Sequence, residues 1–313
     1  MKSYLDLINE CIRFPYPNSD EYSTRIASYY FLVHRGYTIG YLIPSVVEAI
    51  KNLRECSLFW SINDQAKTVK LKGEPSVQAH SWAIEQTVIS WRKDDVFKVL
   101  RGWRNELYAV YAPPGKLAFN IERSASCLFG VLTYGVHMMA YVRSKAGLKL
   151  WIPRRAYNKQ TYGGYLDNTV AGGLASGERA LEVLVREAEE EASLPAELVR
   201  NNAKSVGTIT YFYVRDARAG GEIGLLQPEC QYLYDLELNE DVVLKPCDSE
   251  VEEFYLWGVE EVAKELKDGH FKPNCAFALI DFFMRHGIIT PENEESYIEI
   301  SSRLHRRLGF ATP

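Results

Sequence analysis

The stretch GGLASGERALEVLVREAEEEASL, residues 172–194, decides the fold of the C-terminal part of this chain. Its apolar residues recur at helical spacing and predict a helix over residues 178–192 with one face on a core: Leu181, Leu184, Val185, Ala188 and Ala192. Glu187, Glu190 and Glu191 stand at positions i, i+3 and i+4, so their carboxylates project from one flank of this helix. Like charges at these spacings cost an isolated helix about 0.2–0.5 kcal/mol per pair, so we expect a cation to offset them.

A divalent cation is the natural partner of this acidic cluster. Mg²⁺, with Mn²⁺ as the alternative, prefers carboxylate and water oxygens and leaves positions open for substrate phosphates. Arg186 would orient a neighbouring carboxylate through a forked hydrogen bond. Taken alone, such a cluster is more often a solvated helix face, so the surrounding residues decide between the two interpretations.

Those residues resemble the Nudix box, G-x5-E-x7-R-E-U-x-E-E-x-G-U, in which U is apolar. The box positions with a matching residue are Gly172, Glu178, Arg186, Glu187, Ala188, Glu190, Glu191 and Leu194. Ser193 stands where the box has its second glycine, and Pro195 follows two residues later. We interpret this departure as a different exit from the helix, because the residue before a proline disfavours helical geometry.

The resemblance implies an α/β fold, in which the glutamate helix packs on a mixed sheet in an α/β/α sandwich. It implies hydrolysis of an organic diphosphate with a divalent metal held by Glu187, Glu190 and Glu191. Arg186 would hold these glutamates in place, supported by Glu178, and Gly172 and Gly173 would let the backbone approach the helix and the metal closely. The metal would neutralise the diphosphate and activate the attacking water.

The family often uses a further carboxylate as general base. The segment DSEVEEFYLW, residues 248–257, offers Glu250, Glu252 and Glu253 as candidates. A solvated surface position is an equally good interpretation of each.

Composition and charge narrow the class of protein. The chain has 313 residues, 47% hydrophobic and 25% charged, as expected for a globular protein of about two domains. The net charge of −5 gives no footprint for nucleic acid. Six cysteines without a CxxC pair predict reduced, mostly buried thiols. The N-terminal MKSYLDLINE is not typical of a signal or transit peptide, so we expect a cytoplasmic protein.

Residues 124–142, SASCLFGVLTYGVHMMAYV, carry no formal charge over a length that could span a bilayer. Gly130 and Gly135 divide the stretch into short β-prone pieces, and His137 interrupts it. We therefore predict core strands here and no membrane partner.

Along the chain, Pro113, Pro114 and Gly115 suggest a domain boundary. We expect a smaller α+β domain over residues 1–115, the Nudix domain over 116–285, and a tail or helix over 286–313 that packs on it. Helices are expected at about 4–12, 45–53, 80–100, 178–192, from residue 259 and over 273–285, and strands at 135–143, 147–153, 205–215 and 229–238. Gly163, Gly164, Gly172 and Gly173 indicate a loop before the glutamate helix.

A narrower resemblance comes from the sequences around the box. KQTYGGYLDNTVAGGL (159–174), WRNELYAVY (103–111) and EEASLP (190–195) resemble the fungal and plant Nudix subgroup related to thiamine pyrophosphokinase. This implies a diphosphatase that converts thiamine diphosphate, or its oxidised and damaged forms, to the monophosphate and phosphate.

Aromatic side chains in these segments suit such a substrate, because a cationic ring stacks well on an aromatic face. The candidates are Trp103, Tyr108, Tyr162 and Tyr165, and a position in the core is the alternative for each. Gln160, Asp167 and Asn168 are either substrate contacts or turn formers before the box.

Two other functions stay open from the sequence. The same chemistry could act on a prenyl diphosphate or a nucleoside diphosphate sugar, or the fold could bind a diphosphate without hydrolysing it. The intact set of glutamates argues against the latter. We expect a small-molecule substrate and either a monomer or a homodimer.

Overall fold

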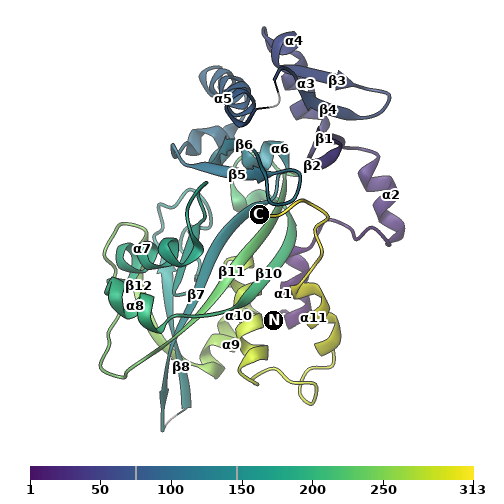
Figure 1. The fold of residues 1–313 in the computed structure, drawn as a ribbon. Coiled ribbons are helices and arrows are strands. Elements are labelled where there is room, and N and C mark those ends of the chain that lie inside the picture. Colours follow the sequence, from purple (N-terminus) through teal and green to yellow (C-terminus); the bar gives the residue numbers. More distant parts are fainter. Residues whose placement is uncertain (75, 146) are drawn as a thin grey trace.

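A computed structural model describes residues 1–74, 76–145 and 147–313 of the chain. Its C-terminal part is built around one six-stranded mixed sheet (Figure 1). The strands are β7 (Thr133–Ser144), β8 (Gly147–Arg155), β9 (Val170–Gly173), β10 (Lys204–Val214), β11 (Leu226–Leu238) and β12 (Val251–Gly258). Their order is β10-β11-β7-β8-β12, with β9 on β7, and only the β11–β7 pair is parallel.

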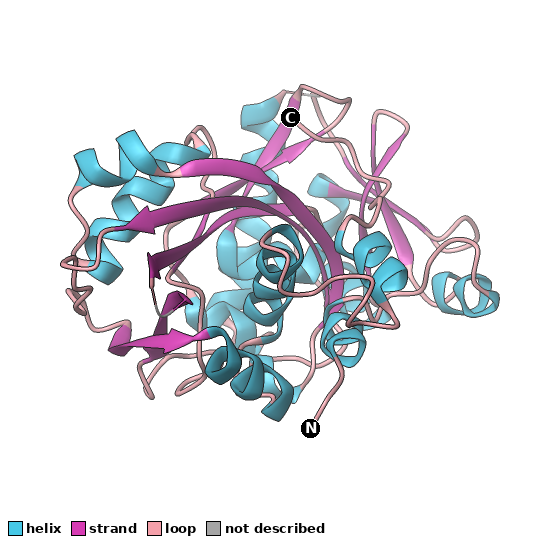
Figure 2. Cartoon of the chain, turned by 90° about the horizontal axis from the view of Figure 1, so that it is seen from below, coloured by secondary structure: helices cyan, strands magenta, loops and turns pink. Residues whose placement is uncertain are grey.

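Strand β7 is the centre of this sheet because its side chains alternate between two apolar layers. Val136, Met138 and Ala140 face the layer that contains α7 (Ala180–Ala192) and α8 (Ala196–Asn202). Met139 and Tyr141 face the opposite layer. That layer contains α1 (Tyr4–Cys11), α9 (Val259–Asp268), α10 (Pro273–Arg285) and α11 (Tyr297–Leu304). The predicted mixed sheet between two helical layers is therefore confirmed (Figure 2).

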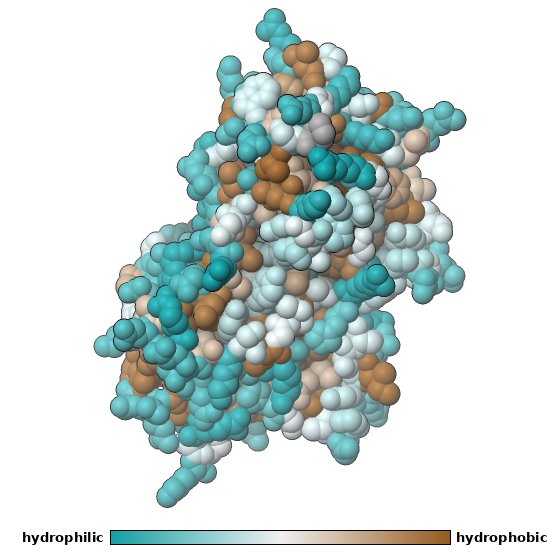
Figure 3. Space-filling view, viewed as in Figure 1, coloured by the Kyte–Doolittle hydropathy of each residue, from teal (hydrophilic) through white to brown (hydrophobic). Residues whose placement is uncertain are grey.

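The N-terminal part forms a second, smaller α+β unit. Its sheet has the order β2-β1-β4-β3, with β1 (Tyr30–His34), β2 (Tyr37–Leu42), β3 (Trp60–Asn63) and β4 (Thr68–Leu71). The helices are α2 (Asp20–Ile26), α3 (Pro44–Lys51), α4 (Cys56–Phe59), α5 (Val77–Lys93) and α6 (Ser126–Phe129). Short 3-10 turns cover Lys98–Gly102 and Arg123–Ala125 in this part, and Ala217–Ala219 in the C-terminal part. Hydrophilic residues cover most of the face drawn in Figure 3, and the apolar residues on the surface include Leu58, Trp82 and Ile298.

A hairpin joins the two parts. It consists of β5 (Leu107–Tyr111) and β6 (Leu117–Glu122), and its turn contains Pro113, Pro114 and Gly115. The predicted domain boundary at residue 115 passes through this turn, and both strands of the hairpin belong to the apolar cluster of the N-terminal part. At the other end of the chain, the C-terminal segment returns to the hairpin, where the Gly115 N–H donates to the carbonyl of Thr312 over 2.8 Å.

Most of the predicted elements are present, with two local differences. The helix expected over 80–100 ends at Lys93, because Asp95 adopts a left-handed backbone with φ +50°. The loop expected at Gly172 and Gly173 is instead strand β9, whose backbone pairs with β7.

The uncharged stretch 124–142 forms α6 and most of β7, which is buried. Across the described ranges, no helix combines the length and the apolar character needed to cross a membrane. The six cysteines are all free, as predicted, and Cys247 is the exposed one.

Candidate active site

Helix α7 carries the glutamates, and its fit against β9 is the centre of the site. Gly172 lies directly on Glu187, since a Cβ atom at residue 172 would come within 2.5 Å of the Glu187 Cγ and 2.6 Å of its Cδ. One turn further on, the Glu191 carboxylate accepts a hydrogen bond of 3.2 Å from the backbone N–H of Ala171. Two of the three predicted carboxylates therefore lie against the same short strand.

Burial gives these two carboxylates unusual proton affinities. Burial and the nearby Glu187 and Asp167 carboxylates raise the pKa of Glu191 well above its usual range. Burial also raises the pKa of Glu187, although the Arg186 guanidinium opposes it. Both pKa values rise because the negative charge of each carboxylate is shielded from water, and a cation at this position would stabilise that charge.

Glu190 is in a different environment. Its side chain is 52% exposed, and the Arg186 Nη1 atom lies 2.9 Å from a Glu187 oxygen and 3.4 Å from a Glu190 oxygen. Arg186 also pairs with Glu178 at 3.4 Å, and Glu178 accepts a hydrogen bond from the Ala175 N–H. The predicted network of arginine and glutamates is therefore present as a set of ion pairs at the exposed edge of the helix.

The spacing of the three glutamates bears on the predicted metal. In the part of the chain that the structure describes, no three His, Cys, Asp or Glu side chains are grouped closely enough to hold an ion, and the carboxylates of Glu187 and Glu190 both pair with Arg186. The donor chemistry nevertheless fits a hard divalent cation, since Glu187 and Glu191 present buried, mutually repelling carboxylates beside β9. Metal binding by the three glutamates stays a proposal.

Ser193, the departure from the box, ends α7 in a left-handed conformation with φ +53°. A glycine would adopt this backbone more easily. The Ser193 hydroxyl compensates in part by donating to the Lys245 carbonyl over 3.0 Å. The helix exit therefore keeps the left-handed geometry for which the box glycine is suited, so the expectation of a different exit is wrong, and α7 is complete up to Ala192.

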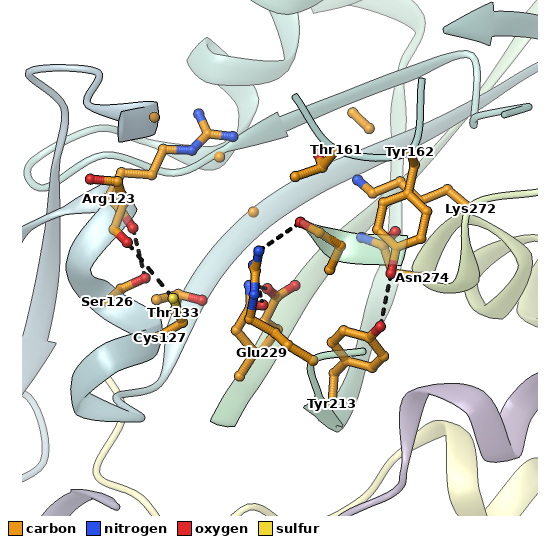
Figure 4. Close-up of a pocket in the computed structure, with 18 of the residues that line it drawn as sticks. Arg123, Ser126, Cys127, Thr133, Thr161, Tyr162, Tyr213, Glu229, Lys272 and Asn274 are labelled. Carbon is orange, nitrogen blue, oxygen red and sulfur yellow. Dashed lines mark hydrogen bonds between the residues drawn. The ribbon is translucent and has the colours of Figure 1, made fainter. Parts of the chain in front are cut away.

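A cavity of about 250 Å³ opens beside β9, between the hairpin of the N-terminal part and the C-terminal sheet. Ala171, Gly172 and Gly173 form part of its wall. Its cationic lining residues are Arg104, Arg123, Arg215 and Lys272. Figure 4 shows Arg123 on one side of this cavity and Tyr162, Lys272 and Asn274 on the other.

The inner wall of the cavity combines aromatic rings with hydrogen-bond acceptors. Glu229 on β11 receives hydrogen bonds from neutral donors, the Gln231 amide at 2.8 Å, the Gln227 amide at 2.9 Å and the Tyr211 hydroxyl. The other amide atom of Gln231, its Oε1, is buried without a hydrogen-bond partner among the described residues. The hydroxyls of Tyr162 and Tyr213 meet at 2.8 Å on the same wall.

The predicted substrate contacts divide between this cavity and the core. Gln160, Tyr108 and Tyr162 line the cavity. Trp103 and Tyr165 do not belong to its lining; Trp103 donates to Asn105 and stacks under Arg92, while Tyr165 packs edge-on against Tyr162.

Asp167 and Asn168 are buried behind β9 and engaged by protein groups. Asp167 pairs with Arg155 at 2.5 Å and accepts a hydrogen bond from the Cys275 thiol at 2.6 Å. The Asn168 side chain joins the His137 ring at 2.6 Å and the Cys275 carbonyl at 3.1 Å. Neither residue lines the cavity and neither lies in a turn, so the structure shows them in a buried polar network that differs from both interpretations, and a role in substrate binding stays a prediction.

The candidates for the general base are held by cations. Glu250 pairs with Lys159 and lies 3.7 Å from Arg104. Burial raises the pKa of Glu250, but its hydrogen bond and attraction to Lys159 outweigh this and lower it. Glu253 accepts from the Tyr255 hydroxyl and lies 3.6 Å from Arg154, outside the cavity lining, and Glu252 is exposed.

Sequence reasoning missed several lining residues. Arg123, Arg215, Glu229 and Lys272 come from four separate elements, and no motif connects them. Arg123 directly precedes the uncharged stretch, and Arg104 lies within WRNELYAVY, but no local pattern marks either arginine as a binding residue.

A mixed sheet between helical layers, with a glutamate-bearing helix against a glycine strand, is the arrangement of a Nudix domain, and the C-terminal part of the chain is a Nudix domain. The NUDIX domain family matches residues 133–277, and a family described as a domain of unknown function, DUF4743, matches residues 3–133. These matches confirm the predicted Nudix hydrolase and meet at residue 133. The division of the chain into domains at residue 115 stays a proposal.

The chain is similar to three curated proteins. Uncharacterized protein YJR142W of Saccharomyces cerevisiae is 32% identical over 99% of this chain and 92% of that protein. The chloroplastic Nudix hydrolases 20 and 24 of Arabidopsis thaliana are 39% and 38% identical over 68% and 66% of this chain. The matched regions cover 57% and 54% of those two plant proteins.

Among solved structures, the MutT protein from Methanosarcina mazei Go1 matches 49% of this chain and 91% of its own. The sequence identity is 19% and the TM-score is 0.35.

Proposed function

We propose that this chain is a divalent-metal-dependent diphosphatase whose substrate is thiamine diphosphate or one of its oxidised analogues. Water would attack one phosphorus of the diphosphate, and the bond from that phosphorus to the bridging oxygen would break. The bridging oxygen would stay with the other phosphorus, giving thiamine monophosphate and phosphate with the protons of the water shared between the products and solvent. The observation that carries this proposal is the cavity beside β9. Its wall contains Ala171 and Gly172, which lie against Glu191 and Glu187 of α7, together with a group of aromatic rings around Glu229. The α7 carboxylates themselves are not among its described lining residues.

The end of the cavity beside β9 suits the diphosphate. Glu187, Glu190 and Glu191 would hold the cation, which supplies charge neutralisation and a bound water of lowered pKa. Arg186 and Glu178 keep the outer carboxylates in position through the ion pairs described above. Of the carboxylates proposed as base, Glu250 is the better placed, because its partner Arg104 lines the cavity.

The inner wall suits a small heteroaromatic ring that donates hydrogen bonds or carries positive charge. Glu229 and the free Oε1 of Gln231 are acceptors, and Tyr162, Tyr211 and Tyr213 supply aromatic surface. An aminopyrimidine linked to a thiazolium has both properties. A prenyl chain has neither, and it would cover the Glu229 carboxylate with apolar atoms that bring no positive charge, which is unfavourable because the protein's own donors to Glu229 are all neutral.

The volume of the cavity distinguishes the proposed substrate from the remaining alternative, a nucleoside diphosphate sugar. About 250 Å³ lies just below the range of ordinary ligand sites, which span roughly 300–1,000 Å³. This volume suits a substrate with two small linked rings on one side of the diphosphate better than a nucleoside diphosphate sugar, which places a bulky group on each side.

The test is a substrate panel with purified full-length chain and Mg²⁺. Thiamine diphosphate, oxothiamine diphosphate, geranyl diphosphate and UDP-glucose are compared by phosphate release and by chromatography of the organic product. We expect turnover of the thiamine compounds and its loss in Glu190→Gln and Glu191→Gln. We also expect Glu229→Gln to raise KM for thiamine diphosphate about tenfold or more, since one charge-assisted hydrogen bond contributes about 1.5–3 kcal/mol.

Two outcomes would overturn the proposal. Preferential cleavage of geranyl diphosphate or UDP-glucose would reassign the substrate while keeping the Nudix chemistry. Tight binding of a diphosphate without any turnover would favour a binding module, the function that the intact glutamates argue against.

A further inference from the structure

The side chain of Arg123 enters the Nudix site from the N-terminal part of the chain. Arg123 directly follows β6, in the region that matches the domain of unknown function, and its guanidinium lies over β9. A Cβ atom at Gly173 would be 3.3 Å from the Arg123 Cζ and 2.0 Å from the Tyr108 hydroxyl oxygen. The absence of a side chain at residue 173 is therefore what admits these two residues to the strand beside the glutamates.

The protein holds Arg123 by one end only. Its Nη1 atom donates to Glu106 over 2.7 Å, and its guanidinium lies 5.7 Å from the centre of the Tyr108 ring. Within the described ranges, Nε and Nη2 have no hydrogen-bond partner, while the side chain is 38% exposed and lines the cavity. Figure 4 shows the Arg123 side chain among the residues that line the cavity.

The electrostatic environment of Arg123 includes the catalytic helix. Burial disfavours its positive charge, whereas Tyr108, Glu106 and Glu187 all favour it, so Arg123 and the Glu187 carboxylate attract each other across the glycine strand. A planar guanidinium with two free donors matches the oxygens of a phosphate, to which it can bind through parallel hydrogen bonds.

We propose that Arg123 binds the diphosphate of the substrate, so that the N-terminal part supplies a substrate-binding residue to the Nudix site. This inference rests on the proposed function, because it assumes a diphosphate beside β9. It assigns the hairpin and the turn after β6 a direct part in the chemistry: one guanidinium contacts the phosphate oxygens from the side opposite α7, where negative charge develops as the bridging oxygen leaves.

Binding of a non-hydrolysable probe tests the inference without relying on turnover. Methylenediphosphonate is titrated into the full-length chain with Mg²⁺ by calorimetry, for wild type, Arg123→Gln, Arg123→Lys, Glu106→Gln and Arg101→Gln. Arg101 is an exposed arginine of the same part, paired with Asp95 and absent from the cavity lining, so Arg101→Gln is the matched control. Melting temperatures are recorded for every variant.

We expect Arg123→Gln to weaken probe binding roughly 10- to 100-fold, in line with the loss of a charge-assisted hydrogen bond. Arg123→Lys keeps the charge and should recover part of the affinity, and Arg101→Gln should bind like wild type. Glu106→Gln breaks the same ion pair as Arg123→Gln but leaves the guanidinium in the cavity, so it should lose much less affinity at a similar change in melting temperature.

Three results would overturn the inference. Wild-type affinity in Arg123→Gln would show that the guanidinium does not contact the diphosphate. Equal losses in Arg123→Gln and Glu106→Gln would show that Arg123 only braces the hairpin. If wild type itself neither binds the probe nor hydrolyses any diphosphate, the proposed function fails, and the role of Arg123 fails with it.

Discussion

Replacing Gly172 by alanine should disable the site through the position of a single carboxylate. Gly172 has no positive φ, so alanine fits its backbone without strain. The added methyl group, however, would stand 2.5 Å from the Glu187 Cγ and 2.6 Å from its Cδ. Ordinary contact requires 3.4 Å, so the Glu187 side chain must withdraw by about 0.9 Å.

A displacement of about 1 Å at a catalytic group costs on the order of 100-fold in rate, or about 2.7 kcal/mol of transition-state stabilisation. We therefore expect kcat of Gly172→Ala to fall by about that factor. Overpacking between α7 and β9 should also lower stability by about 1–3 kcal/mol.

The assay is phosphate release from thiamine diphosphate in Mg²⁺, at a temperature where circular dichroism shows the variant fully folded. Gly258→Ala is the matched control, because a Cβ atom there meets no atom within 4 Å and its φ is −70°. If Gly172→Ala kept kcat within about twofold of wild type, the position of Glu187 could not control the rate, and our account of the glycine strand would be wrong.

Glu191→Gln should abolish turnover yet raise the melting temperature by about 2–4 °C, which corresponds to roughly 1 kcal/mol. The glutamine amide can still accept the hydrogen bond from the Ala171 N–H, while the buried negative charge is removed. A lower melting temperature in calorimetry would contradict this. Asp167→Asn should lower the free energy of unfolding, measured by urea titration, by about 3–5 kcal/mol, since Arg155 loses the carboxylate with which it pairs. An unchanged free energy of unfolding together with a raised KM would instead make Asp167 a substrate contact. Burial lowers the pKa of His137 from 6.5 to about 4, so the unfolded chain takes up a proton at higher pH than the folded chain does. The free energy of unfolding should therefore fall by about 3 kcal/mol as the pH drops from 6.5 to 4. Above pH 6.5 this histidine should have no effect on it. Urea titrations across this range should show that slope in wild type and not in His137→Gln.

The sequence predicted the glutamate helix well because the apolar period of α7 and the spacing of its carboxylates are local properties. It predicted β7 for a similar reason, since an uncharged stretch divided by glycines is typical of a buried strand. Gly172 and Gly173 were expected in a loop, because no local pattern shows that a glycine pair will be the place where two other elements approach a strand.

What the sequence could not predict concerns partners that are distant in the chain. Asp167 is a candidate substrate contact from the sequence, whereas in the structure it accepts a hydrogen bond from the Cys275 thiol, 108 positions away. Glu229 and Arg123 come together only because β11 pairs with β7 and the N-terminal hairpin folds over the cavity, so neither could be recognised from its neighbours.

Helix α1 has a consequence for how this protein can be divided. It opens the region that matches the domain of unknown function, yet its apolar residues Leu7, Ile8 and Cys11 are buried with α10 in the catalytic half. A gene fragment that begins at residue 133 would encode all of the box, but it would expose to water the apolar surface of α10 that α1 covers. We therefore expect the Nudix half to need this first helix for its stability, although the helix belongs to the region that matches the domain of unknown function.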